Sequence, residues 1–258
     1  MKTDILASFP AMMANVREKE PIVQAITNFV TVNDCANIIL AAGASPTMAH
    51  EVEEVAEVAS VVQGLVMNMG TMEDVEAMLV AGKAANEAGV PVVLDPVAVG
   101  ATRLRREGGK KLLENVKFSV IRGNTSEIKH LAVGTGSTRG VDAAEEDKIT
   151  EDNYKAFGYM ARELARKTGA VIAISGVIDI IASPDRVFAL RNGDAMMSRI
   201  TGSAVCSQPF WVPSAAVIPI IFWKPPYALY PLWVSAVKSP EKKLTHRAQV
   251  PSHSAPIW

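Results

Sequence analysis

The chain has 258 residues, a net charge of −1 and 49% hydrophobic residues, which suits one α/β domain with a sizeable core. It has no basic face suited to nucleic acid, and no basic segment followed by an apolar run opens it. The two cysteines, Cys35 and Cys206, are too few for a disulfide framework. We therefore expect a reduced, cytoplasmic protein with no nucleic-acid partner.

Strand-like and helical segments alternate along residues 1–203. The apolar spacing of residues 4–18 predicts an amphipathic opening helix. The predicted strands are residues 21–27, 61–70, 90–96, 118–124 and 169–176, and the predicted helices are residues 32–44, 71–89, 102–115, 125–133 and 151–169. This order predicts a central, mainly parallel sheet with helices on both faces, closed at one edge by a hairpin over residues 177–193.

Helix boundaries follow from capping residues. Asn33 or Asp34 is expected to cap helix 32–44, Gly43 to stop it, and Thr71 to cap helix 71–89. For helix 125–133 the expected cap is Thr125 or Ser126.

Polar residues follow each predicted strand. They occur at Asn28 and in segments 67–71, 94–100, 121–127 and 174–176. Because the carboxyl ends of parallel strands share one edge of a sheet, we expect these residues to gather there as a binding site.

Two carboxylates and one guanidinium stand out at that edge. Asp95 and Glu127 could hold Mg²⁺, largely through water, and the planar fork of Arg122 could meet a polyphosphate. Each acid also has a structural alternative, because Asp95 before Pro96 can simply end a strand and Glu127 can sit in the first turn of a helix. Together they predict phosphoryl transfer, without the glycine-rich fingerprints of P-loop or dinucleotide-binding proteins.

Four ordered segments then carry a family resemblance: "AITNFVTVNDCANIILAAGASPTM", "LDPVAVGATRLRR", "VIRGNTSEI" and "AISGVIDII". Over roughly residues 5–203 the sequence resembles hydroxyethylthiazole kinase, a ribokinase-like enzyme of thiamine salvage. The resemblance implies a three-layer ribokinase-like fold and transfer of the ATP γ-phosphate to 4-methyl-5-(2-hydroxyethyl)thiazole. It also implies Mg²⁺, and a homotrimer if the C-terminus is intact.

The resemblance also implies roles for individual residues. It assigns Met48, Asn28 and Gly202 to the thiazole, Arg122, Asn124 and Ser175 to ATP, and Asp95 and Glu127 to Mg²⁺. From the residues alone, Met48 could equally be a buried plug. Ser175 stands where the family usually has Thr, and Val177 where it usually has Glu.

The resemblance stops after Ser203. The family's "TGTGC"-type segment opens a helix whose N–H groups form an anion hole, with its Cys beside the attacking hydroxyl. Thr201, Gly202 and Ser203 match, but Ala204 stands for Gly and Val205 for the catalytic Cys. Turnover of this chain is therefore expected to be low.

Residues 204–258 differ in composition from the rest. They hold all 4 Trp, 9 of the 15 Pro and none of the 17 Gly, with 5 Lys or Arg against 1 acid. The prolines exclude long helices, and with Lys224 they interrupt any membrane span. We expect a kinase domain over 1–203 followed by an aberrant tail over 204–258.

A reading-frame shift after Ser203 accounts for the tail. Codons for "AVCSQPFWVP", with one extra G placed in front, can be read as "GCMLTALLGA", which restores the missing Gly and Cys. Two alternatives stay open: a non-catalytic thiazole- or nucleotide-binding remnant, and a related kinase of a pyrimidine or pyridoxal alcohol. "GASPTM" and the early "ITN" disfavour the second alternative.

Overall fold

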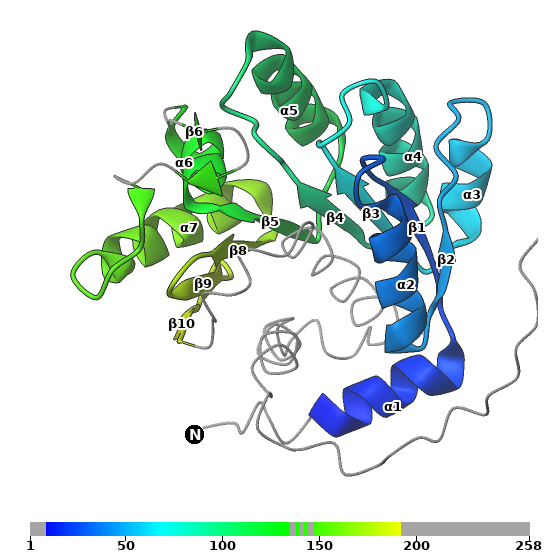
Figure 1. Ribbon diagram of the computed structural model, residues 1–258, viewed down its shortest axis with the longest axis horizontal. Coiled ribbons are helices and arrows are strands. Elements are labelled where there is room, and N and C mark those ends of the chain that lie inside the picture. The colour runs from blue at the N-terminus through cyan, green and yellow to red at the C-terminus, as the bar shows by residue number, and fades with distance from the viewer. Residues whose placement is uncertain (1–8, 135–137, 140–141, 144–146, 192–258) are drawn as a thin grey trace, which may run out of the picture.

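A computed structural model describes residues 9–134, 138–139, 142–143 and 147–191. Within these residues, eight strands form one sheet in the order β10-β9-β8-β5-β4-β3-β1-β2 (Figure 1). The strands are β1 (Ile22–Ile26), β2 (Ser45–Thr47), β3 (Gly64–Asn68), β4 (Val92–Asp95), β5 (Val120–Asn124), β8 (Val171–Ser175), β9 (Asp179–Ala182) and β10 (Val187–Leu190). All neighbours from β2 to β8 are parallel, whereas β9 and β10 are antiparallel. The predicted parallel sheet and edge hairpin are confirmed.

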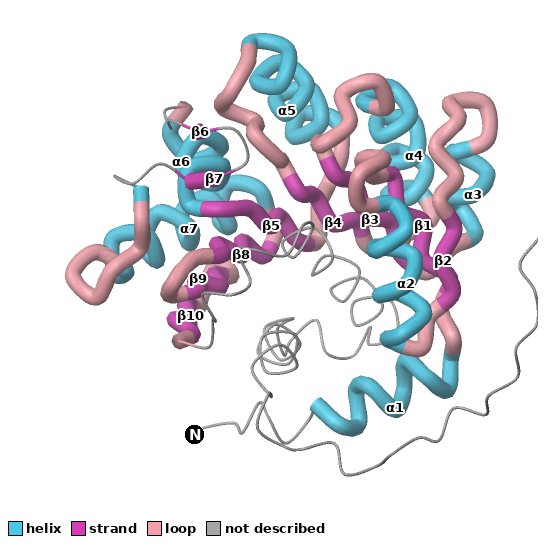
Figure 2. The backbone as a smooth tube through the Cα atoms, viewed as in Figure 1, coloured by secondary structure: helices cyan, strands magenta, loops and turns pink. Residues whose placement is uncertain are grey.

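Helices cover both faces of this sheet, as predicted (Figures 1 and 2). One face carries α3 (Val55–Val61), α4 (Val75–Glu87), α5 (Arg103–Asn115), α6 (Thr125–Val133) and α7 (Tyr154–Thr168). The other carries α1 (Phe9–Lys19) and α2 (Val32–Ala42). A short hairpin of β6 (Thr138–Arg139) and β7 (Asp142–Ala143) follows α6.

The sheet separates two hydrophobic clusters, because successive side chains of a strand point to opposite faces. The larger cluster joins the α3–α7 helices to the sheet residues Met67, Leu94, Ile121 and Ile174. The smaller cluster joins Val16 of α1 and Ile39 of α2 to Val66, Val93, Val120 and Ala173. The strand residues on both faces of the sheet are buried, which explains why the strand sequences are nearly continuous apolar runs.

The structure differs from the expected helix starts. Thr31 rather than Asn33 or Asp34 occupies the N-cap of α2, and Asp74 rather than Thr71 that of α4, neither with a side-chain cap hydrogen bond. Gly43 ends α2 in the left-handed conformation, as predicted. These N-cap predictions were wrong because the polar pattern does not distinguish the cap from its neighbours.

Besides the short β6–β7 hairpin, two elements were not predicted: β2, which contains Pro46, and the seven-residue helix α3. Both are held by tertiary contacts rather than by a strong local pattern, β2 by pairing with β1 and α3 by packing on α4.

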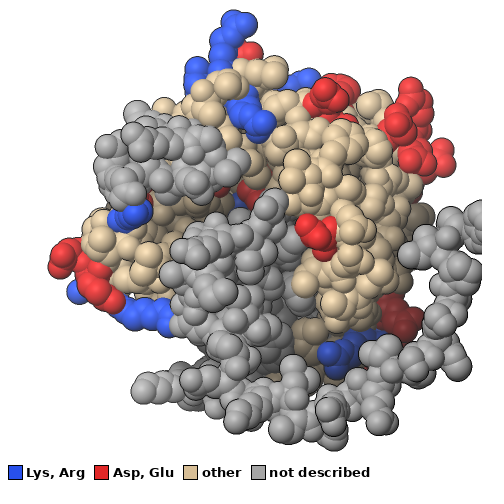
Figure 3. Space-filling model, viewed as in Figure 1, with Lys and Arg blue, Asp and Glu red and all other residues tan. Residues whose placement is uncertain are grey.

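Charged side chains of both signs lie on the described surface. In Figure 3, Lys and Arg gather mostly at the top of the view and Asp and Glu at the upper right. Among the helices that the structure describes, none is long and apolar enough to cross a bilayer.

Candidate functional site

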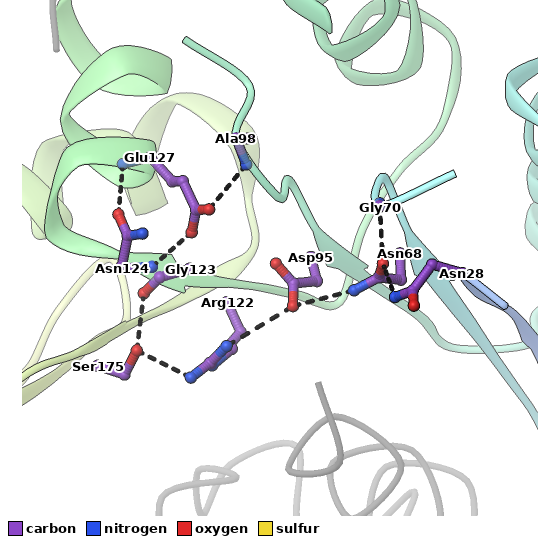
Figure 4. A network of polar contacts seen from close by, with 10 residues as sticks. All are labelled: Asn28, Asn68, Gly70, Asp95, Ala98, Arg122, Gly123, Asn124, Glu127 and Ser175. Carbon is purple, nitrogen blue, oxygen red and sulfur yellow. Dashed lines mark hydrogen bonds and ion pairs between the residues drawn. The ribbon is translucent and has the colours of Figure 1, made fainter. Parts of the chain in front are cut away.

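Four polar side chains lie on one face of four neighbouring strands, near the carboxyl edge of the sheet. Three of them are the last residues of β3, β4 and β8, and the fourth lies two positions before the end of β5. Each lies two positions after a small apolar residue whose side chain packs on the α1/α2 face; the four are Asn68, Asp95, Arg122 and Ser175. Their strands are adjacent, and Asn68 is directly opposite Asp95 in the ladder. The predicted gathering of polar residues at the carboxyl edge is therefore found, and Figure 4 shows it as one network.

Amide side chains form one half of the network. Asn28 Nδ2 donates to Asn68 Oδ1 at 3.2 Å, and Asn68 Nδ2 donates to Asp95 Oδ2 at 3.2 Å (Figure 4). The Gly70 N–H donates to the same Asn68 oxygen at 2.8 Å. A Cβ at Gly70 would lie 2.5 Å from that oxygen, so only glycine lets the loop after β3 approach so closely. Asn28 is thereby linked to the buried Asp95 through a single residue.

Arg122 organises the other half. Its Nη1 lies 3.6 Å from Asp95 Oδ2, and its Nη2 donates to Ser175 Oγ at 2.8 Å. Arg122 and Asp95 are only 4% and 1% exposed. The Arg122 Nε is buried and has no hydrogen-bond partner among the described residues. A buried guanidinium with an unused donor fits a site that takes an anionic ligand.

Glu127 has a structural role at the same edge. Its Oε2 accepts from the Asn124 N–H at 2.7 Å, and Asn124 Oδ1 accepts from the Glu127 N–H at 2.9 Å. This capping box makes Asn124 the N-cap of α6, so Thr125 and Ser126 were wrong predictions for that position. The second oxygen, Oε1, accepts from the Ala98 N–H at 2.8 Å and fixes the loop after β4.

Burial dominates the electrostatics of the two acids. It raises the pKa of Asp95 to about 8, against the opposing charge of Arg122. It also raises the pKa of Glu127, against the N–H groups of Ala98 and Asn124 and the charges of Arg122 and Arg105. Burial thus favours the protonated form of Asp95, and a bound cation would favour its charged form.

The donor set at this edge fits a hard cation bound with few protein ligands. No group of three His, Cys, Asp or Glu side chains that could hold a metal occurs within the described part of the chain. Mg²⁺ commonly keeps several waters and takes only one or two carboxylates besides phosphate oxygens. Asp95 and Glu127 could supply those carboxylates beside a guanidinium suited to phosphate.

The remaining predicted residues fall into two groups. Met48 follows β2 and packs, partly buried, against the hydrophobic cluster of the α1/α2 face, where its carbonyl oxygen lies 3.1 Å from His50 Nδ1. Both the plug and the thiazole contact therefore stay predictions for Met48. Gly202 and Val205 lie outside the described residues, as does the tail over 204–258.

Two residues of the site were not singled out from the sequence. Asn68 lies in the polar segment 67–71, but its position between Asn28 and Asp95 depends on strand order. Arg105 donates through Nη1 to the Met69 and Val97 carbonyls. The sequence does not single it out, because Arg103 and Arg106 lie in the same first turn of α5.

Known proteins are similar to this chain in sequence and in fold. Residues 13–218 match the hydroxyethylthiazole kinase family. A hydroxyethylthiazole kinase of Clostridium acetobutylicum is 54% identical over 193 residues, covering 74% of this chain and 71% of that protein.

Two solved structures are similar to this chain in fold. The hydroxyethylthiazole kinase protein from Pyrococcus horikoshii OT3 matches with a TM-score of 0.74 and 30% identity, over 88% of this chain and 82% of that one. A pyridoxal kinase from Staphylococcus aureus in complex with ADP matches with a TM-score of 0.56 over 83% of this chain and 84% of that one; at 12% identity it shows the fold alone. The architecture is ribokinase-like, as expected, and the chain belongs to the hydroxyethylthiazole kinase family.

Proposed function

We propose that this chain is a phosphotransferase that moves the γ-phosphate of ATP to the hydroxyl of 4-methyl-5-(2-hydroxyethyl)thiazole. The observation that carries the proposal is the buried Asp95–Arg122 pair at the carboxyl edge of the sheet, 3.6 Å apart, in a chain of this family. Such an edge combines a cation-binding acid with a phosphate-binding guanidinium.

ATP is assigned to the Arg122 half of the network. The guanidinium would meet the phosphates, while the Ser175 hydroxyl both orients it and faces the nucleotide. Asn124 contributes by capping α6, whose N-terminus then presents favourable partial charge to an anion. Asp95, with Glu127 beside it, would hold Mg²⁺, which supplies charge neutralisation of the phosphates during transfer.

The thiazole is assigned to the opposite side, near Asn28, Met48 and Gly202. Support comes from the link between Asn28 and Asp95 through Asn68, which couples that side to the cation site. The partly buried Met48 side chain offers an apolar surface to an uncharged ring.

The sequence after Ser203 implies that this chain works slowly. The valine side chain at position 205 cannot accept a proton from the attacking hydroxyl, and general acid–base help is commonly worth roughly 10²–10⁴-fold. A reading-frame shift is the origin we propose for the tail. Sequencing the source DNA across the codons for Ile200 to Trp211 tests it, because an additional G would restore the Gly-Cys pair.

The family membership supports three further assignments: a step in thiamine salvage, a cytoplasmic setting, and a homotrimer if the C-terminus is intact. Sedimentation equilibrium tests the last of these, and a monomer of this chain would tie assembly to the altered tail.

The function is tested by incubating the full chain with Mg·ATP and the thiazole alcohol and following the products by ³¹P NMR. We expect slow formation of the thiazole phosphate, and faster formation by the double variant Ala204→Gly, Val205→Cys. Saturable binding of both ligands without any product would instead indicate a binding remnant. Turnover of only a pyridoxal or pyrimidine alcohol would contradict the substrate.

A further inference from the structure

One peptide group of the loop after β4 lies between two opposite charges. The Val97 carbonyl accepts from Arg105 Nη1 at 2.9 Å, and the Ala98 N–H donates to Glu127 Oε1 at 2.8 Å. The carbonyl and the N–H belong to the same peptide unit, so a cation and an anion contact its two ends. Both hydrogen bonds are charge-assisted, and such bonds reinforce each other through a polarisable peptide.

Arg105 also reaches the neighbouring loop. Its Nη1 donates to the Met69 carbonyl at 2.5 Å, and its Nη2 lies 3.4 Å from the Gly70 carbonyl oxygen. One guanidinium therefore joins the loop after β3 to the loop after β4. These loops follow directly the strands that end in Asn68 and Asp95.

The backbone conformation of Ala98 explains why the loop after β4 needs these contacts. Ala98 has a φ of +53°, a left-handed conformation that residues other than glycine adopt only when their surroundings hold them there. The only other non-glycine residue with positive φ among those described is Glu20, far from the site along the chain. Glu127 and Arg105 supply the restraint from opposite sides.

The first turn of α5 offers an internal comparison. Arg103, Arg105 and Arg106 all lie there, but Arg105 is half-buried while the other two are exposed. Arg103 pairs with Glu107 at 3.7 Å, and Arg106 donates only to the Gly100 carbonyl at 3.1 Å. Only Arg105 of the three bridges two strand-end loops in the described structure.

We propose that Arg105 is a positioning residue: together with Glu127 it clamps the Val97–Ala98 peptide and ties the loops after β3 and β4, which holds Asn68 and Asp95 in place for the Mg·nucleotide. Arg105 acts through these groups and makes no contact with the ligand. The effect on the ligand rests on the proposed function, whereas the clamp itself does not.

The clamp is tested by residue-resolved amide exchange of the full chain, in wild type, Arg105→Gln and the matched control Arg106→Gln. Removing the guanidinium should speed exchange of the Ala98 and Gly70 amides by about tenfold or more, because both loops lose a restraint. The control should leave both amides within about twofold of wild type, since it removes a contact to Gly100 alone. Equal exchange in the two variants would overturn the clamp.

The link to the ligand is tested by calorimetric titration of Mg·ATP into the same three proteins. Arg105→Gln should weaken binding about five- to tenfold, the Arg106→Gln control less than twofold, in line with a lost charge-assisted contact. Arg105→Lys keeps the charge but not the planar guanidinium, and should recover part of the affinity for Mg·ATP. In Arg105→Ala, added free guanidinium should also recover part of that affinity.

Failure of the proposed function can be distinguished from failure of the positioning role of Arg105. If wild type binds no Mg·ATP, the proposed function fails, and amide exchange alone decides the clamp. If wild type binds and Arg105→Gln binds equally well, the positioning role is wrong whatever the exchange data show.

Discussion

The two faces of the sheet edge differ sharply although they are built from neighbouring residues of the same four strands. One face ends in Met67, Leu94, Ile121 and Ile174, which form the core under α3–α7. The residues one position later are Asn68, Asp95, Arg122 and Ser175, which form the polar network (Figure 4). Because side chains alternate along a strand, four strand ends can build a core and a site at once.

The two faces should contribute differently to the stability of the fold and to ligand binding. Substitutions on the core face should destabilise the fold and spare the affinity of folded molecules. Substitutions on the polar face should do the reverse.

Leu94→Ala removes a fully buried side chain from the core face. The free energy of unfolding should fall by about 3 kcal/mol, the usual cost of a large-to-small core substitution. Urea denaturation measures it, and Mg·ATP titration of the folded protein should give an affinity within about threefold of wild type. A large loss of affinity without a loss of stability would refute the division between the faces.

Asp95→Asn changes the adjacent residue on the polar face. Affinity for Mg·ATP should fall roughly 100-fold, about 2.7 kcal/mol, because the amide cannot neutralise Mg²⁺. Stability should not fall. Because burial raises the pKa of Asp95 from 3.8 to about 8, this acid costs folding free energy as pH rises through that range, and the uncharged Asn side chain has no such cost. An unfolded variant would show that Asp95 is needed chiefly for the fold.

Arg122→Gln removes the guanidinium from between Asp95 and Ser175. We expect Mg·ATP affinity to drop about 30-fold, the scale of one or two charge-assisted hydrogen bonds to phosphate. Affinity for the thiazole alcohol, measured in a separate titration, should change less than threefold. Equal losses for both ligands would contradict the assignment of ATP to this half of the network.

The raised pKa of Asp95 makes Mg·ATP binding depend on pH. Below about pH 8 the cation must displace a proton, so affinity should rise about tenfold between pH 7 and 9 and then level off. Asp95→Asn serves as the control and should lack this rise. The same pH profile in the variant would assign the proton to another group.

Ser175→Ala tests the smallest effect. It removes the hydroxyl that accepts from Arg122 Nη2 at 2.8 Å. Loss of one such hydrogen bond should weaken Mg·ATP about threefold, with no change in thiazole affinity. Ser175→Thr keeps the hydroxyl and should bind as wild type does.

Much of this edge could be predicted from the sequence. Apolar runs ending in polar residues predicted the parallel sheet, and Asp95, Arg122 and Ser175 lie in the same network. The contacts of Asn68 and Arg105 could not be predicted, because each depends on which strands or loops are adjacent in space. The cap of α6 was misassigned because Asn124 is also the last residue of β5, and local sequence does not show where one element gives way to the next.

Phosphate transfer from ATP to the thiazole alcohol should depend on the polar face of the sheet edge. The most direct measurement is ³¹P NMR of that reaction with the full chain and with Asp95→Asn, each carrying the Ala204→Gly and Val205→Cys changes. We expect thiazole phosphate from the first protein and at most about one hundredth of its rate from the second. Equal rates, or no product from either while the chain is folded, would contradict it.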